Sequence, residues 1–378
     1  MTRVRHVLLN AILWIILAFP SFAAELQRLV DEKTDIFTVG VSESEITVVY
    51  PERIDILTAT RETELFSTLD TNQRAIISAN GKYIGIMTFV AGTGEYMVIS
   101  GFELYESSGK PLFKIEHEYH TAYYISNSGY LISVLRDVES PEFAKLYFYN
   151  RNGSRSEEMD LPGLQTFDFS PDGDTFVANT KTGVRAFRCP SGDPVWEINT
   201  TCQYFATSDA AAYTALVNQD RIRFYEQDQL LGEKTVRNPF PRDLSISANG
   251  AYTALADRWN LYLFETQSAQ EVWHTESGDP GKTFVSVDIN DAGTYILVGI
   301  DVDRGGNAPV NERHTRGIIQ AYDRTGIKIF ENEIRYHMWH YRTPHVTFLP
   351  GSERSAIIQT RQELYQLELP LQQDDTKD

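Results

Sequence analysis

The residues best suited to chemistry gather near the C-terminal end of the 378-residue chain, where four of its eight histidines fall between positions 314 and 345. Imidazoles bind metals, whereas aromatic and arginine clusters are typical of protein-binding hot spots. On a strand, His337 and Trp339 would point to one side and His340 to the other, which weakens a metal site. Ordinary packing, a binding surface and, last, a metal site remain the alternatives. The candidate binding residues here are His314, Arg335, His337, Trp339, His340, Arg342 and His345.

A second group of candidates opens the polar segment 301–316. Asp301 and Asp303 stand in an Asp-x-Asp-x-Gly pattern, with Asn307 beyond them, like the start of a calcium loop. Hard cations need several oxygens, which alternate residues of a curled loop can supply. A solvated acidic turn is favoured, no cofactor or metal is predicted, and calcium is kept as the minor alternative.

Searches for catalytic motifs favour a non-enzyme. The chain has no Gly-x-Ser-x-Gly elbow, no phosphate-binding Gly-Lys loop and no dinucleotide-binding glycine pattern. His117 and His120 lack one residue of the zinc-protease spacing and fall in a strand-like region, so they could not share a helix face. No catalytic residue is proposed from the sequence.

The elements that would position these residues follow from an internal repeat. One phrase recurs: an apolar alternation, a Ser or Asn, a turn that contains Gly, an aromatic residue and a second apolar run. The glycines at 81, 129, 173, 250 and 293 are 48, 44, 77 and 43 residues apart, so the period is about 44 and the step of 77 covers two repeats. The clear and degenerate copies begin at Ile77, Ile125, Phe169, Thr207, Ile246, Ile289 and Phe348.

Each repeat predicts four antiparallel strands. Asn-Gly and Asp-Gly tolerate the positive φ of a tight hairpin turn, and a second glycine turn, such as Asn152-Gly153, follows an aromatic-rich strand. Two turns and a return loop in about 44 residues make one four-stranded propeller blade. The interval from Gly293 to Gly351 is 58 residues, about 14 longer than the repeat, and 301–316 is the extra segment.

These phrases carry a resemblance to a known group of proteins. Ser170-Pro171-Asp172-Gly173 and the Trp196 and Trp273 phrases (Ser-Gly-x-x-x-Trp, and Ser-Ala-x-x-x-Trp) resemble the WD-repeat, TolB-like and quinoprotein-like β-propeller superfamily. The resemblance covers nearly all of the chain after residue 23. It implies an all-β propeller and is unspecific for function. A quinoprotein would imply a quinone pocket, often with adjacent cysteines, which this chain lacks.

The ends of the chain set the number of blades. The last repeat holds only three strands, and the segment before residue 70 holds one degenerate blade. We therefore predict eight blades, with 26–30 supplying the missing strand, because an open ring would expose sheet edges. Seven blades with a longer N-terminal closure remain the alternative. The expected organisation is a signal peptide at 1–23, one propeller at 24–371 and an acidic tail at 372–378.

The N-terminal segment predicts export. Arg3 and Arg5 precede the apolar run 7–19, and Ser21-Phe22-Ala23 offers a cleavage site, so we expect a periplasmic or secreted protein without a membrane span after cleavage. An uncleaved anchor is the alternative. In an oxidising compartment, Cys189 and Cys202 are expected to form a disulfide, with free buried thiols as the alternative.

Charge and repeats together favour a binding scaffold. The net charge of −18 argues against nucleic acid and anionic membranes as partners. The first hypothesis is an exported, non-catalytic propeller that binds a protein or another ligand, with the face around 301–316 and 335–345 in contact. The second is a propeller enzyme or cofactor protein, quinoprotein- or lactonase-like, with a site in the central channel. Three or more charged groups that meet at one channel mouth would favour the second.

Overall fold

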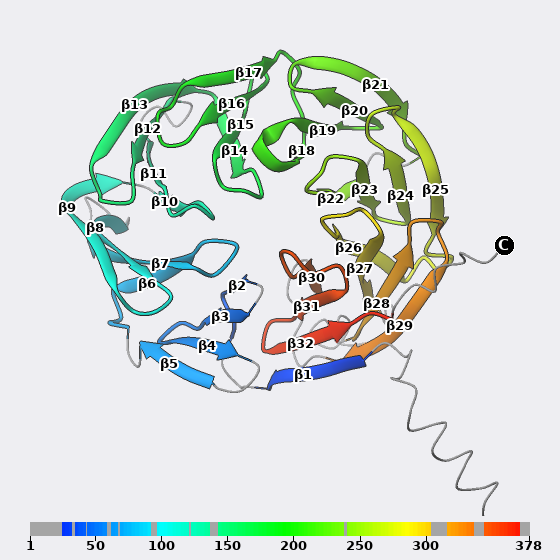
Figure 1. Cartoon of the computed structure of the whole chain (residues 1–378), viewed down its shortest axis with the longest axis horizontal. Helices are drawn as coiled ribbons and strands as arrows, with labels where there is room; N and C mark the ends of the chain where they lie inside the picture. The colour runs from blue at the N-terminus through cyan, green and yellow to red at the C-terminus, as the bar shows by residue number, and fades with distance from the viewer. Residues whose placement is uncertain are drawn as a thin grey trace, which may run out of the picture.

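The computed structural model describes residues 25–31, 35–42, 44–58, 62–66, 69–91, 97–120, 122–136, 143–237, 240–303, 316–335 and 344–370. These residues form eight four-stranded antiparallel sheets, arranged as blades around a central axis (Figure 1). The prediction of an all-β propeller with eight blades is confirmed, and the seven-bladed alternative is wrong. The predicted signal peptide and acidic tail lie outside the described residues.

Each blade begins with an inner strand beside the axis and ends with an outer strand at the rim (Figure 1). Blades 1 to 4 contain β2 (Thr38–Val41), β3 (Glu45–Val49), β4 (Ile54–Thr58) and β5 (Glu62–Phe66); β6 (Gln73–Ile77), β7 (Tyr83–Ala91), β8 (Met97–Glu106) and β9 (Pro111–His120); β10 (Ala122–Ile125), β11 (Leu131–Arg136), β12 (Phe143–Tyr149) and β13 (Arg155–Pro162); β14 (Leu164–Phe169), β15 (Thr175–Thr180), β16 (Val184–Arg188) and β17 (Pro194–Ile198).

Blades 5 to 8 follow the same plan. They contain β18 (Tyr204–Thr207), β19 (Tyr213–Asn218), β20 (Arg221–Glu226) and β21 (Gln229–Thr235); β22 (Pro241–Ile246), β23 (Tyr252–Asp257), β24 (Asn260–Glu265) and β25 (Gln270–Glu276); β26 (Lys282–Ile289), β27 (Tyr295–Val302), β28 (Arg316–Asp323) and β29 (Lys328–Arg335); β30 (His345–Phe348), β31 (Ser355–Gln359), β32 (Glu363–Glu368) and β1 (Glu25–Asp31). A 3-10 helix, η1 (Asp209–Ala211), replaces the first turn of blade 5.

The N-terminal strand closes the ring. β1 pairs with β32 antiparallel, with Leu26 opposite Leu367 and Gln27 opposite Gln366. Leu26 packs against the apolar cluster between blades 7 and 8. The prediction that 26–30 supplies the missing strand is confirmed, and the last blade thereby gains its outer strand.

The two ends of the ring differ because the strands of a blade alternate in direction. We call one end the turn face: it carries the turns from first to second strand, 42–44, 78–81, 126–129, 170–173, 208–211, 247–250, 290–293 and 349–352. The opposite end, the loop face, carries the connections from second to third strand and those between blades. The repeat phrase therefore encodes the turn face, where the N–H of Gly173 (φ +77°) donates to the carbonyl of Ser170 at 2.7 Å.

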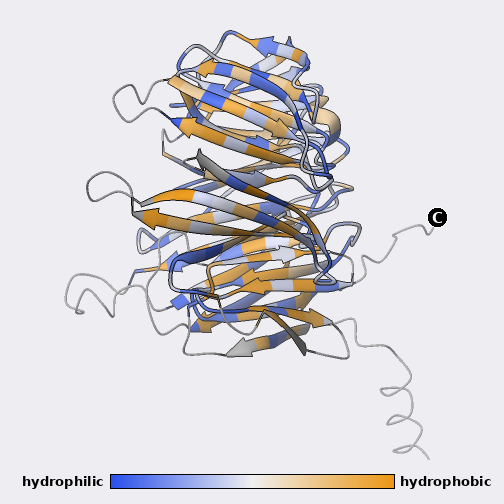
Figure 2. Cartoon of the chain, turned by 90° about the vertical axis from the view of Figure 1, so that its left-hand side faces the viewer, coloured by the Kyte–Doolittle hydropathy of each residue, from blue (hydrophilic) through white to orange (hydrophobic). Residues whose placement is uncertain are grey.

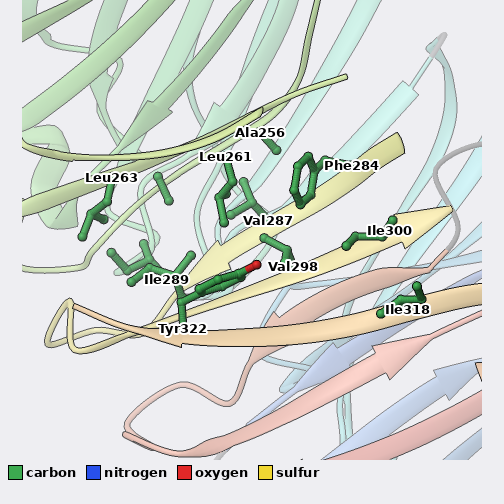
Figure 3. Close-up of a cluster of buried hydrophobic side chains, with 12 residues drawn as sticks. Ala256, Leu261, Leu263, Phe284, Val287, Ile289, Val298, Ile300, Ile318 and Tyr322 are labelled. Atoms are coloured by element: carbon green, nitrogen blue, oxygen red, sulfur yellow. The ribbon is translucent and has the colours of Figure 1, made fainter. Parts of the chain in front are cut away.

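Apolar side chains fill the spaces between blades. Between blades 6 and 7, Leu261 and Leu263 pack against Phe284, Val287 and Val298, all of them almost fully buried (Figure 3). Burying a side chain of this size stabilises the fold by about 1.5–3 kcal/mol. Apolar residues also run along the stacked strands in the side view (Figure 2). Because neighbouring blades cover both sheet faces, second strands such as β27 are nearly continuous in apolar residues.

Candidate functional site

The predicted binding residues that the structure describes all lie at the loop face. Asp301 and Asp303 are at the end of β27, Arg335 ends β29 and His345 begins β30. The remaining candidates, His314, His337, Trp339, His340 and Arg342, lie outside the described residues. The strand ends that flank 304–315 and 336–343 thus lie on one face of blades 7 and 8, where β28 pairs with β29 through Arg316 and Arg335.

Asp301 belongs to a strand rather than to a curled loop. Its Cα lies opposite Thr283 on one side and Gly317 on the other, and the residue is only 8% exposed. The interpretation of a solvated acidic turn is therefore wrong for Asp301, although Asp303 is exposed. Within the described part of the chain, no three His, Cys, Asp or Glu side chains are placed to hold a metal ion.

Arg335 and His345 are both exposed at this face. Glu333 links β28 and β29: Arg316 donates its Nε–H to Glu333 Oε1 at 2.8 Å, and Arg335 Nε lies 3.6 Å from the same oxygen. His345 Nε2 is 3.3 Å from the hydroxyl of Thr347. The start of β30 is anchored because Ser286 donates to the carbonyl of Pro344 at 2.7 Å. The strand ends that carry the long segments are therefore firmly held.

The predicted disulfide is not formed. Cys189 and Cys202 are both buried free thiols, and burial raises the pKa of each to about 12. Cys189 lies at the turn face, before β17, and Cys202 lies at the loop face, after β17. A five-residue strand spans about 17 Å, whereas bridged Cα atoms lie about 4–7 Å apart. Closeness in sequence misled the prediction because one whole strand separates the thiols.

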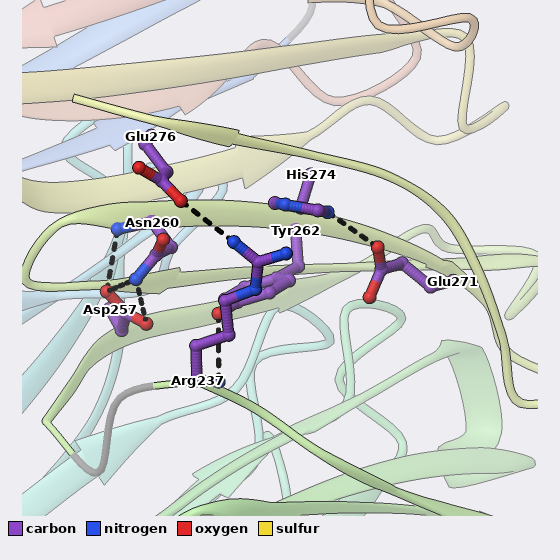
Figure 4. A network of polar contacts seen from close by, with 7 residues as sticks. All are labelled: Arg237, Asp257, Asn260, Tyr262, Glu271, His274 and Glu276. Atoms are coloured by element: carbon purple, nitrogen blue, oxygen red, sulfur yellow. Dashed lines mark hydrogen bonds and ion pairs between the residues drawn. The ribbon is translucent and has the colours of Figure 1, made fainter. Parts of the chain in front are cut away.

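A polar network braces the loop face of blade 6 (Figure 4). Asp257 is fully buried and accepts hydrogen bonds from the N–H groups of Trp259 and Asn260 at 2.7 and 2.6 Å. Burial raises the pKa of Asp257, and these hydrogen bonds partly offset that effect. Tyr262 accepts the N–H of Arg237, whose guanidinium pairs with Glu276 at 2.8 Å. Because these groups are committed to one another, the network is structural.

A cavity lies on the axis, toward the turn face. It encloses about 740 Å³ and is lined by the inner strands of all eight blades and by several of their turns. Its volume falls within the range of small-molecule sites, about 300–1,000 Å³. The cavity therefore opens at the opposite end of the ring from the predicted binding residues, and only the second hypothesis expected a site in the central channel.

Two of the aspartates that line the cavity act as clamps between blades. Asp288 of β26 accepts the hydroxyl of Ser245 at 2.7 Å and the N–H of Ile289 at 2.9 Å with Oδ1, and the N–H of Phe348 at 2.8 Å with Oδ2. Asp291 accepts the N–H of Gly351 at 2.9 Å. Burial raises the pKa of Asp288 to about 6 despite these hydrogen bonds.

The third aspartate, Asp168 of β14, has fewer hydrogen-bond partners than Asp288. One oxygen accepts the N–H of Phe169 at 2.8 Å, and no other partner of this carboxylate is found among the described residues. The side chain is exposed to the cavity, yet protein surrounds it, and this desolvation raises its pKa to about 6. Asp168 is thus an available carboxylate within a protein-walled channel.

Aromatic rings lie on the same side of the cavity. Tyr124 of β10 is 41% exposed, and its ring meets Phe167 edge-on with centroids 4.2 Å apart. Phe169 and Phe205 also line the wall. Since Phe167 immediately precedes Asp168, the Tyr124 ring leans toward the strand that carries the available carboxylate.

An enzyme would be favoured by three or more charged groups that meet at one mouth of the channel. The cavity has three such groups, but their arrangement differs from that expectation. Asp168, Asp288 and Asp291 all line it, but two of them are committed to backbone N–H groups of the next blade. No His or Cys is among its lining residues, and general acid–base work needs partners within hydrogen-bond reach of a reacting group.

No helix long and apolar enough to span a membrane occurs among the described residues. No protein-family model matches the chain, and no curated protein sequence matches it. Solved structures share its fold: Sqt1 from Saccharomyces cerevisiae is 10% identical, with a TM-score of 0.60 over 91% of this chain and 98% of that one.

Two further structures agree. The C-terminal WD40 domain of Sif2 is 12% identical, with a TM-score of 0.59 over 93% of this chain and all (100%) of that one. BamB from Moraxella catarrhalis is 10% identical, with a TM-score of 0.55 over 91% of this chain and 100% of that one. At such low identity the likeness shows the fold alone. The chain is an eight-bladed β-propeller.

Proposed function

We propose that the protein is an exported, non-catalytic propeller that binds a protein partner through its loop face, around 301–316 and 335–345. The basic, apolar and small residues of 1–23 support export to the periplasm or the exterior. WD40-type propellers commonly serve as interaction scaffolds, and rigid rings carry their contacts on loops.

The observation that carries the proposal is the position of exposed apolar side chains. Five of the nine large ones among the described residues lie at strand ends on the loop face. These are Phe37, Val90, Leu135, Phe143 and Phe240. Exposed apolar groups are typical of protein-binding surfaces, and Arg335 of blade 7 is exposed on the same face of the ring.

The test replaces 304–315 by a short Gly-Ser linker in the tagged protein. The backbones of Asp301 and Gly317 are paired, so a short turn can close β27 onto β28 and the melting temperature should stay nearly unchanged. Partner capture from the exported fraction should be lost. As a matched control, Ile327→Asp removes an apolar side chain that is 63% exposed at the turn face and should leave capture intact.

Two results would overturn this proposal. The linker variant could fold and still capture every partner, which would place the binding surface elsewhere. Alternatively, Leu135→Asp and Phe143→Asp could leave capture as strong as Ile327→Asp does, and the exposed apolar groups of the loop face would then have no role in binding.

An enzyme that works in the channel is the second candidate, because Asp168 and Asp288 have pKa values of about 6 in one cavity. Carboxyl groups in that range can transfer protons at neutral pH. Metabolite profiling of an extract incubated with the wild type and with Asp168→Asn distinguishes the two. Turnover that the variant abolishes would make the enzyme the better description.

A further inference from the structure

The formal charge in the central cavity has a single sign. Asp168, Asp288 and Asp291 line it, and no Lys, Arg or His is among its lining residues. Asp172 and Asp209 stand at the turn-face rim, where burial and then the charges of Asp172 and Asp291 raise the pKa of Asp209. A concave site with low-dielectric walls focuses such a field and attracts cations.

Comparison of two equivalent positions shows which carboxylate is available. Asp168 lies two residues before the turn residue Ser170, as Asp288 lies two before Asn290, so both occupy the same level of their inner strands. At that level, blade 6 places Ser245 beside Asp288. Blade 3, which precedes the blade of Asp168, has Tyr124 at the equivalent position, two residues before Ser126.

The following blade differs as well. Phe348 donates its N–H to Asp288, whereas no bond from the equivalent Thr207 to Asp168 occurs among the described residues. On this side of the ring, Asp172 makes the hydrogen bond to the next blade instead, because it accepts the N–H of Ala210 at 2.9 Å. Inner strands β22, β26 and β30 lie side by side, while β14 makes no comparable approach to β10 or β18 among the described residues. Asp168 therefore faces the more open side of the cavity.

The surroundings of Asp168 match one class of ligand. An aromatic face stabilises a neighbouring cation, and Tyr124, Phe169 and Phe205 all lie on this wall. A metal ion would need several ligands in one place, and the described residues offer no such group. We propose that the cavity binds an organic cation, an ammonium or guanidinium group, with Asp168 as its counter-ion and Tyr124 as its aromatic wall.

The ligand group has two sources, a free amine or the side chain of a polypeptide. This site is independent of the loop-face proposal, because it opens at the other end of the ring. The experiment titrates the full-length mature protein by calorimetry with cadaverine, with a capped Gly-Gly-Lys-Gly-Gly peptide and with the same peptide acetylated on its lysine. Binding of cadaverine and of the unmodified peptide indicates that the cation alone suffices. Binding of the unmodified peptide alone indicates a polypeptide side chain.

Variants assign the binding to the cavity. Asp168→Asn should weaken it at least tenfold and Asp168→Glu should restore most of it, with melting temperature as the check on folding. Tyr124→Ala should weaken it about fivefold, whereas Tyr124→Phe should keep it. Asp228→Asn is the matched control, because it removes one charge from an exposed turn at the outer edge of blade 5.

The pH dependence provides a second readout. Protonation of Asp168 should weaken binding about tenfold from pH 7 to pH 5, and this dependence should shrink in Asp168→Asn to what Asp288, Asp291, Asp172 and Asp209 contribute. If none of the three probes binds, the proposal is overturned. It is also overturned if the acetylated peptide binds as well as the unmodified one, or if folded Asp168→Asn binds like the wild type.

Discussion

Asp243 of blade 6 accepts the backbone N–H of Val287 in blade 7 at 2.9 Å. The next blade repeats the arrangement, since Asp288 accepts the N–H of Phe348. Inner strands have no further strand beside them on the axis, so their free N–H groups need other acceptors. These two carboxylates are such acceptors, and they hold blade 6 against blade 7 and blade 7 against blade 8.

This arrangement predicts the effect of removing a clamp. Asp288→Ala should lower the free energy of unfolding by about 2 kcal/mol, because it leaves the N–H groups of Ile289 and Phe348 without their acceptor. Urea denaturation measures the change. Asp228→Ala, at an exposed turn, should stay within about 0.5 kcal/mol of the wild type. Equal losses in both variants would show that the clamp is not specific.

The pH dependence of stability has a definite sign. The pKa of Asp168 is raised from 3.8 to about 6, so its protonated form favours the folded state. That contribution is fully present below pH 3.8 and is lost as the pH rises through 6. Between pH 4 and pH 7 the wild type should therefore lose stability relative to Asp168→Asn. Denaturation curves across this range, compared at each pH, test the difference; a constant difference would contradict it.

The thiols should be unreactive in the folded protein. With pKa values near 12 and both side chains buried, Cys189 and Cys202 should resist alkylation at pH 8 and react only after unfolding. Mass spectrometry of unreduced protein, alkylated in denaturant, should find two modified cysteines. A reductant should leave the melting temperature unchanged. One cross-linked pair and no free thiol would restore the disulfide.

The closing strand offers a matched pair of substitutions. Leu26→Asp should destabilise the protein by at least about 2 kcal/mol, because Leu26 packs between blades 7 and 8. Gln27→Asp changes the next residue, whose side chain is exposed, and should have little effect. Thermal denaturation compares the two. Similar stabilities would mean that β1 adds pairing without burial.

One turn glycine is under a clear steric constraint. A Cβ at Gly173 would lie 2.7 Å from the backbone nitrogens of Asn127 and Ser128, and its φ is +77°. Gly173→Ala should cost about 1–3 kcal/mol, since both the contact and the backbone conformation are unfavourable. Gly278 also has a positive φ (+68°), but nothing lies within 4 Å of its Cβ position. Gly278→Ala should therefore cost less, and calorimetric melting compares them.

The fold could be predicted because its signals are local. Each turn is marked by a glycine after Ser or Asn. Because these turns recur about every 44 residues, the number of blades can be counted without any knowledge of long-range contacts. Even the ring closure could be predicted by counting strands, since the last repeat has only three and the segment 26–30 has the pattern of a fourth.

The cavity could not be predicted in the same way. Asp168 and Asp288 are 120 residues apart, and only the radial arrangement of β14 and β26 turns both toward one axis. A signal existed nonetheless, because each aspartate stands two residues before its turn residue, on the inner strand of its repeat. Which of the two is left available depends on the neighbouring blades. That information lies in side chains such as Ser245 and Tyr124, which belong to other repeats.

The pairing of β1 with β32 also sets the order of events when the protein is made. β1 finds its partner only when residues 363–368 have emerged. Until then β1 lacks its neighbouring strand β32, and its open edge invites pairing with other chains. Biogenesis therefore has a vulnerable interval that lasts as long as synthesis itself, and a fusion or a stalled chain that holds back either terminus would prolong it.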